Sequence, residues 1–176
     1  MSDLGFLRIA LEQARRSPPK PTNFCVGAVL VSPSSEKPVL VTGYTLECPG
    51  NTHAEQSCFI KLAETHGIVT TGSKGELETQ LGPLLPNDAV LYTTMEPCNK
   101  RSPGNLTCVE RILMLQTSDG KAAIKKVVCG VREPETFVGE NVGRKCLEDA
   151  GIEVVHVSGL EDEILKVATA GHVQAT

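Results

Sequence analysis

The feature that most constrains the fold of this chain is the alternation of helical and strand-like segments along it. Apolar residues recur at helical spacing near the N-terminus, where Asp3 can cap a helix. Two short apolar runs follow, and the Pro- and Ser-rich segment between them predicts a hairpin. The expected helices cover residues 3–16, 54–66, 108–115, 139–150 and 160–170, and the expected strands cover residues 24–31, 39–44, 89–94, 124–131 and 152–157. This order predicts an α/β fold with three layers, a sheet between two layers of helices, and residues 68–87 are expected to form a loop.

Length and composition favour one domain that spans residues 1–176 and folds without disulfide staples, since 40% of the residues are hydrophobic. The formal net charge of −4 gives no overall attraction for nucleic acid or for an anionic membrane. The first residues lack the pattern of a signal peptide, and no stretch reaches the length of a membrane span. We therefore expect a cytoplasmic protein with no nucleic-acid or membrane partner.

Seven cysteines are many for a chain of this kind, and the number is odd. In a reducing compartment this favours metal ligands and buried thiols over disulfides. Four of the cysteines lie among apolar residues in expected strands or helices, and we expect them to be core residues: Cys25, Cys58, Cys129 and Cys146.

Three separate parts of the chain carry residues of the types that commonly bind zinc. His53 and Glu55 stand at the start of the second expected helix, Cys98 follows Pro97 directly after an expected strand, and Cys108 opens the next helix. One imidazole and two thiolates suit Zn²⁺, and the positive end of a helix favours a thiolate. Three protein ligands leave the fourth position open, as in catalytic zinc sites. The alternative is that these are a helix-start histidine and two buried thiols.

An open zinc site of this composition predicts deamination. Zinc lowers the pKa of water, and the hydroxide that forms can attack a ring carbon bearing an amino group. Glu55 lies two residues past His53, which places its carboxylate beside the metal as a general acid and base. A His-x-Glu followed by Pro-Cys and a second Cys is the arrangement of zinc-dependent deaminases.

One departure from that arrangement is the distance between the two cysteines. Deaminases typically have Cys-x-x-Cys, whereas nine residues separate Cys98 from Cys108 here. A polar loop held at both ends beside a metal is well placed to touch the substrate. Its Lys100 and Arg101 suit a phosphate group, although they are also the kind of charges that simply face solvent.

These motifs resemble a known family. Gly50-Asn51-Thr52-His53-Ala54-Glu55, and Thr94-Met95-Glu96-Pro97-Cys98 with its long loop to Cys108, are similar to the riboflavin-biosynthesis deaminases of the cytidine-deaminase superfamily, above all to their fungal branch. The resemblance covers most of the chain. It implies a five-stranded mixed sheet in a cytidine deaminase-like fold, one Zn²⁺ per chain and a homodimer. It also implies deamination of 2,5-diamino-6-(ribitylamino)pyrimidin-4-one 5′-phosphate at C2, with release of ammonia.

The resemblance further implies that Asn23 contacts the pyrimidine ring, although an asparagine before a strand is also a common turn residue. In the long loop, Asn99, Ser102 and Asn105 offer hydrogen-bond partners for the hydroxyls of an open ribityl chain. We therefore expect the ribitylamino compound to be preferred over its ribosylamino form. Glu133 and Glu135 are expected near the mouth of the site, without an assigned role.

Two other functions fit part of the sequence. A deaminase of bases in RNA or DNA needs a basic surface and stacking aromatic residues, but aromatic residues make up only 3% of this chain and tryptophan is absent. A deaminase of a free nucleoside is a related alternative. A non-enzymatic module stabilised by zinc needs a fourth protein ligand, and no candidate stands near the three in the sequence.

Overall fold

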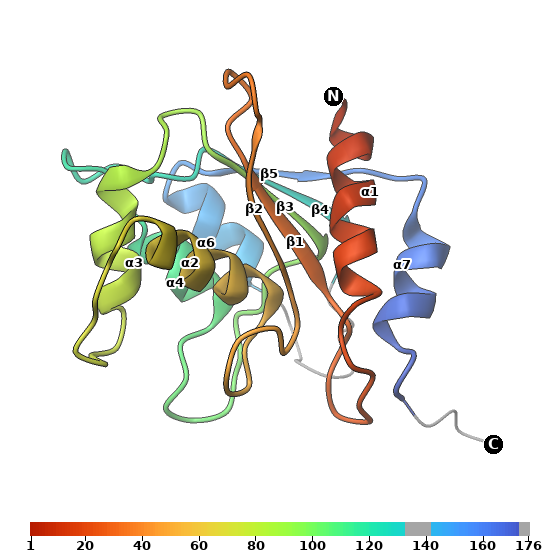
Figure 1. Ribbon diagram of the computed structural model, residues 1–176. Helices are drawn as coiled ribbons and strands as arrows, with labels where there is room; N and C mark the ends of the chain where they lie inside the picture. Colours follow the sequence, from red (N-terminus) through yellow and green to blue (C-terminus); the bar gives the residue numbers. More distant parts are fainter. Residues whose placement is uncertain (133–141, 173–176) are drawn as a thin grey trace.

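The structure, a computed structural model, describes residues 1–132 and 142–172. Its helices and strands follow the expected alternation along the chain (Figure 1). In chain order the elements are α1 (Asp3–Ala14), β1 (Gly27–Val31), β2 (Val39–Tyr44), α2 (Ala54–Thr65), α3 (Glu76–Leu81), the 3₁₀ turn η1 (Gly82–Leu84), β3 (Val90–Met95), α4 (Cys108–Met114), β4 (Lys126–Val131), α6 (Gly143–Asp149), β5 (Glu153–His156) and α7 (Glu161–Ala168).

The five strands form one mixed sheet in the order β2-β1-β3-β4-β5. Strand β1 pairs antiparallel with β2, with which it forms the expected hairpin, and it also pairs antiparallel with β3. The pairs β3–β4 and β4–β5 are parallel, because a helix-containing crossover separates each pair along the chain. The expected five-stranded mixed sheet is confirmed.

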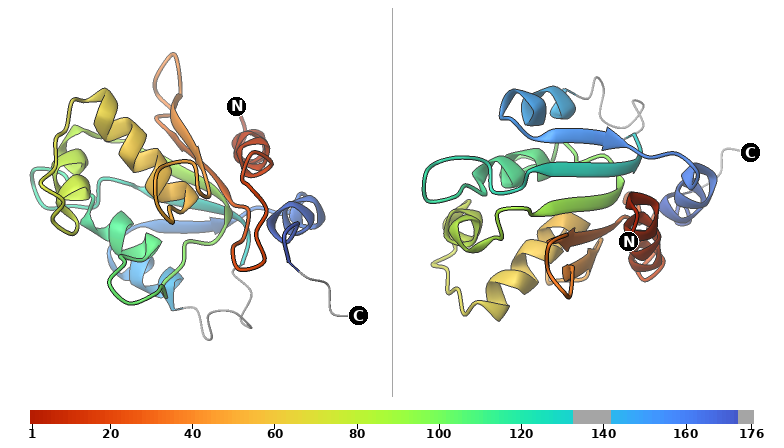
Figure 2. Two further views of the ribbon diagram at one scale, coloured as in Figure 1. Left: turned by 60° about the horizontal axis from the view of Figure 1, so that its bottom comes forward. Right: turned by 90° about the horizontal axis from the view of Figure 1, so that it is seen from above.

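Helices cover both faces of this sheet (Figure 2). Helices α1 and α7 lie on one face, and α2, α3, α4 and α6 lie on the other. Strand β1 shows how the sequence divides between the two layers, because successive side chains point to opposite faces. Val29 and Val31 join the core under α1 and α7, whereas Ala28 and Leu30 join the larger core under α2. The expected three-layer sandwich is therefore confirmed.

The prediction of a loop throughout residues 68–87 is wrong, since α3 and η1 lie within it. Helix α3 has six residues and no side-chain cap, so its local sequence gives little signal. Tertiary contacts hold it instead: Leu81 is fully buried, and the buried carboxylate of Glu78 pairs with Arg111 on α4.

Three smaller expectations also need correction or restriction. Ser2, and not Asp3, caps α1, because the Ser2 hydroxyl accepts the backbone N–H of Gly5 at 3.2 Å. Cys146 is exposed on α6 and is not a core residue, whereas Cys25, Cys58 and Cys129 are buried. Part of the expected helix at 139–150 lies outside the described residues, and so do Glu133 and Glu135. Within the described ranges, no helix is both long and apolar enough to cross a membrane.

Helix α1 approaches β1 so closely that Gly27 has no room for a side chain. A Cβ atom there would lie 1.9 Å from the carbonyl oxygen of Ala10 and 2.5 Å from the backbone nitrogen of Ala14. We predict that Gly27→Ala lowers the free energy of unfolding by roughly 1–3 kcal/mol or more, since overpacking forces the backbone to move. Urea unfolding followed by circular dichroism measures this change.

Gly120→Asn is the matched control. Gly120 is exposed in a turn with a φ of +77°, and a Cβ atom added there would have no neighbour within 4 Å. Asparagine tolerates such a backbone, so this variant should be close to the parent in stability. Equal stability of Gly27→Ala and the parent protein would contradict the close packing of α1 on the sheet.

Candidate active site

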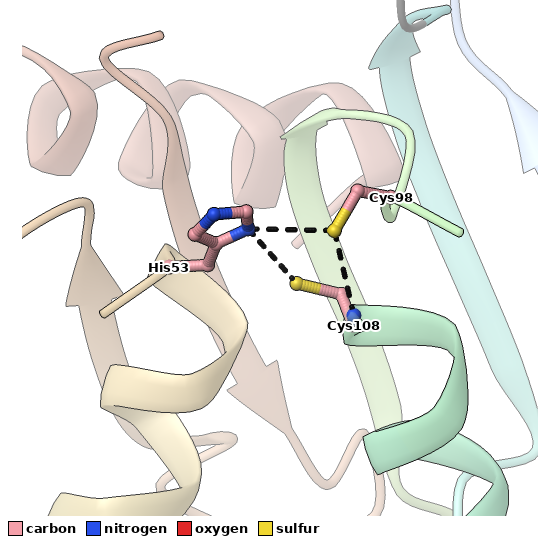
Figure 3. A group of neighbouring side chains, drawn as sticks. All are labelled: His53, Cys98 and Cys108. Carbon is pink, nitrogen blue, oxygen red and sulfur yellow. Dashed lines mark hydrogen bonds between the residues drawn. The ribbon is translucent and has the colours of Figure 1, made fainter. Parts of the chain in front are cut away.

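His53 stands directly before α2, at the N-cap position of the helix. Its backbone is extended, and its side chain makes no capping hydrogen bond. The imidazole is therefore free to turn away from the helix toward the end of β3 (Figure 3).

The two cysteines meet His53 from the other side. Cys98 follows β3, and Cys108 is the first residue of α4. Thr107 caps that helix, and its hydroxyl accepts the N–H of Glu110 while the Glu110 carboxylate accepts the N–H of Thr107. The nine-residue loop thus returns to its starting point, where the N–H of Cys108 points to the Cys98 sulfur at 3.5 Å.

The spacing of the three ligand atoms suits zinc. The Nδ1 atom of His53 lies 3.5 Å from the Cys98 sulfur and 3.4 Å from the Cys108 sulfur. Tetrahedral zinc with ordinary Zn–N and Zn–S bonds requires an N-to-S separation of about 3.5 Å. Within the described part of the chain, these three residues form the group whose ligand atoms all lie within 4.8 Å of one another. The donor set therefore fits a zinc ion with one open position.

Glu55 lies beside this group, in the first turn of α2. Its side chain is buried, and its carboxylate accepts a hydrogen bond from the Cys108 thiol at 3.2 Å. Burial, followed by the negative charge of Cys98, raises the pKa of the Glu55 carboxyl.

The two thiols influence each other in opposite directions. The neighbouring Cys108 side chain lowers the pKa of Cys98, and the contact with the His53 ring acts in the same direction. The neighbouring Cys98 side chain raises the pKa of Cys108, and so do burial and the nearby carboxylate of Glu55. Without a cation the site therefore favours one thiolate, at Cys98.

A pocket of about 370 Å³ opens beside two of the three ligand candidates, His53 and Cys98. Its floor contains His53, Glu55 and Cys98, and its walls come from the segment before β1, from the turn before His53 and from the loop after Cys98. The other lining residues are Thr22, Asn23, Phe24, Val26, Thr45, Asn51, Met95, Glu96, Lys100, Arg101 and Ser102.

Of the residues expected to bind substrate, the pocket brings together Asn23, Lys100, Arg101 and Ser102. Asn99 is not among the lining residues. With its side-chain oxygen turned toward α6, it accepts the backbone N–H groups of Val142 and Gly143 at 3.1 and 3.2 Å.

Asn105 is also absent from the pocket lining and is exposed on the loop. The expectation that Asn99 and Asn105 face the substrate therefore lacks support in the geometry. The loop between Cys98 and Cys108 leaves the site and returns to it, so its middle, with Asn105, faces solvent. The backbone N–H groups at the start of α6 serve as donors to Asn99 at the start of the loop.

Sequence reasoning gave no role to Asn51, which also lines the pocket. Its side-chain oxygen accepts a hydrogen bond from the Asn23 amide at 3.1 Å, so the two asparagines form one polar wall. The available signal was its place in Gly50-Asn51-Thr52-His53, two residues before the zinc-ligand candidate.

Lys100 and Arg101 have different surroundings. The Arg101 guanidinium donates to Gln56 at 3.1 Å, to the carbonyl oxygen of Leu106 at 3.1 Å and to the carbonyl oxygen of Asn51. It thus ties the loop to the start of α2. Lys100 is exposed at the pocket and can reach a ligand with its long side chain.

Two solved structures of one fungal enzyme are similar to this chain. The Rib2 deaminase of Aspergillus oryzae, a C-terminal deletion mutant at pH 4.6, is 43% identical with a TM-score of 0.84, over 98% of this chain and 93% of that one. The same enzyme in complex with DARIPP is 42% identical with a TM-score of 0.81, over 97% of this chain and 91% of that one.

The chain is also similar to a second fungal deaminase and to a protein family. The diaminohydroxyphosphoribosylamino-pyrimidine deaminase of Schizosaccharomyces pombe is 34% identical over 163 residues, 93% of this chain. The chain spans only 34% of that relative's length. The family described as "Cytidine and deoxycytidylate deaminase zinc-binding region" matches residues 1–130. Since this match covers well over half of the sequence, the chain belongs to the cytidine and deoxycytidylate deaminase family.

Proposed function

We propose that this protein is a zinc-dependent hydrolase that deaminates 2,5-diamino-6-(ribitylamino)pyrimidin-4-one 5′-phosphate at C2 and releases ammonia, a step of riboflavin biosynthesis. The observation that carries the proposal is the convergence of His53, Cys98 and Cys108 beside a pocket that His53, Cys98 and Glu55 line. The likeness to a fungal deaminase crystallised with DARIPP supports the choice of substrate.

We assign the metal to the Nδ1 atom of His53 and to the sulfurs of Cys98 and Cys108. The agreement of their separations with a tetrahedral site supports this assignment. Zinc, when bound, supplies the site with water of lowered pKa and thus with a nucleophile at neutral pH.

In this mechanism Glu55 moves the protons. Its carboxylate takes a proton from the attacking water and passes it to the ring nitrogen beside C2, and a second proton leaves with the amine as ammonia. The C2–N bond breaks after a C2–O bond has formed, the second proton comes from the added hydroxyl group, and a carbonyl oxygen takes the place of the amino group. The buried position of Glu55 beside Cys108 supports this role, because the carboxylate has little competition from bulk solvent.

In this proposal, different residues of the pocket wall contact the pyrimidine ring of the substrate and its phosphorylated ribityl chain. Phe24, Val26 and Met95 offer apolar contact for a flat ring, and Asn23 offers hydrogen bonds to its polar edge. We assign the phosphate to Lys100. Arg101, whose two terminal guanidinium nitrogens already donate to protein partners, acts mainly as the brace of the loop.

Two wider features of the proposal follow from the resemblance to the riboflavin deaminases. We propose that two chains associate as a homodimer and that the enzyme works in the cytoplasm on a small phosphorylated pyrimidine. Light scattering coupled to gel filtration tests the first feature directly.

The role of Glu55 generates one prediction. We predict that Glu55→Gln lowers kcat at least ~10²-fold, the usual scale for loss of a general acid and base, while zinc and fold are retained. Stopped assays of ammonia release, with zinc measured on the same samples, give both quantities. Glu64→Gln, an exposed position on the same helix, is the control and should match the parent. Full activity of Glu55→Gln would remove Glu55 from the mechanism.

The different surroundings of Lys100 and Arg101 generate another prediction. Lys100→Ala should raise KM for the phosphorylated substrate roughly tenfold or more and leave KM for its dephosphorylated analogue nearly unchanged, because a charge-assisted hydrogen bond is lost. Arg101→Ala should impair both compounds alike, since it loosens the loop. Lys74→Ala, an exposed loop lysine away from the pocket, is the control. Equal effects of Lys100→Ala on both compounds would refute the phosphate assignment.

Substrate choice is tested by parallel kinetics on three compounds. The ribitylamino compound should exceed the ribosylamino form roughly 10²-fold in kcat/KM, since Ser102 and Asn51 can pair with hydroxyls of an open chain. Cytidine lacks both the phosphate and the extended chain and should be essentially inert. Preference for the ribosylamino form would change the proposed substrate, and preference for cytidine would exclude a role in riboflavin biosynthesis.

A further inference from the structure

The end of α7 and the residues that follow it lie against the segment that leads into β1, although the two stand at opposite ends of the described chain. The backbone N–H of Cys25 donates to the carbonyl oxygen of Ala168 at 2.9 Å. Four residues later, the Nε2 atom of His172 lies 3.0 Å from the carbonyl oxygen of Asn23. Since a carbonyl oxygen only accepts, Nε2 carries the proton of this hydrogen bond.

The contact between the two segments is tight as well as hydrogen-bonded. A Cβ atom on Gly171 would lie 2.3 Å from the backbone nitrogen of Lys20 and 2.6 Å from its carbonyl oxygen. The residue before His172 therefore needs to be glycine for the two backbones to approach this closely. His172 reaches Asn23 because of this approach.

The contact falls on a wall of the candidate active site. Asn23 and Phe24 both line the pocket. The His172 ring packs against the Phe24 ring with centroids 4.7 Å apart and the planes inclined at 58°. The side chain of Asn23 in turn donates to Asn51, which precedes His53 by two residues. A continuous set of contacts thus joins His172 to the turn that carries the first zinc-ligand candidate.

We propose that His172 is a positioning residue for the substrate pocket. Its hydrogen bond fixes the backbone of Asn23, and its ring supports Phe24 from outside the pocket. His172 is not among the residues that line the pocket. Its effect is therefore on binding of the pyrimidine ring and not on the chemical step. This inference rests on the proposed function, because it assigns the wall to substrate binding.

The kinetic test separates KM from kcat for 2,5-diamino-6-(ribitylamino)pyrimidin-4-one 5′-phosphate. His172→Ala should raise KM about fivefold to tenfold, the scale of one or two lost contacts, with kcat within about twofold of the parent. His172→Phe keeps a ring against Phe24 and loses the donor, so its KM should lie between those of the parent and of His172→Ala. His66→Ala, an exposed histidine at the end of α2, is the control and should leave both constants unchanged.

A second readout does not depend on activity. Hydrogen–deuterium exchange should become faster in the peptide covering residues 20–26 of His172→Ala, because the Asn23 carbonyl loses the hydrogen bond that holds this segment against the residues after α7. Peptides that cover His53 and Cys108 should exchange as in the parent, and zinc content should be unchanged.

The outcomes separate this proposal from the proposed function. An unchanged KM for His172→Ala, or an equal fall in kcat and kcat/KM, overturns the positioning role. If the parent protein itself releases no ammonia, the proposed function fails, and the exchange of residues 20–26 alone then decides whether His172 holds this wall.

Discussion

The N-termini of α2 and α4 and the end of β3 meet at one place, and the geometry of the site depends on that meeting. Each element delivers one ligand candidate at its end, so no ligand requires a strained loop to present it. The N-terminus of α4 also directs the backbone N–H of Cys108 toward the Cys98 sulfur, which favours a thiolate there. Because β1 pairs with β3 on the sheet, the segment before β1 is brought to the same side and supplies a wall of the pocket.

The parts of this arrangement that depend on local chemistry could be predicted from the sequence. His53, Glu55, Cys98 and Cys108 are recognisable by type, spacing and place next to expected helices and strands. The sheet was predictable because strands buried on both faces, such as β4, are nearly continuous apolar runs. Helix α3 was missed because burial of Leu81 and the pairing of Glu78 with Arg111 stabilise it, and neither is a local signal.

Roles that depend on what a side chain meets in three dimensions could not be predicted. Arg101 was expected to bind phosphate by its charge, but its two terminal nitrogens donate to the turn before His53 and to the end of the loop. Asn99 was expected at the substrate, whereas the start of α6 satisfies its side-chain oxygen. His172 is far from the pocket in the sequence, and only the approach of Gly171 to Lys20 brings it near. The type of a polar residue therefore shows which hydrogen bonds its side chain can make, but it does not show which partner the fold provides.

The central claim is that three protein ligands hold a catalytic zinc with one position open. X-ray absorption at the zinc edge, combined with elemental analysis of the purified protein, tests this most directly. We predict about one zinc per chain, with two sulfur neighbours at about 2.3 Å, one imidazole nitrogen and one oxygen from solvent. Protein that is folded and free of zinc, or a zinc ion enclosed by four protein ligands, would contradict the account.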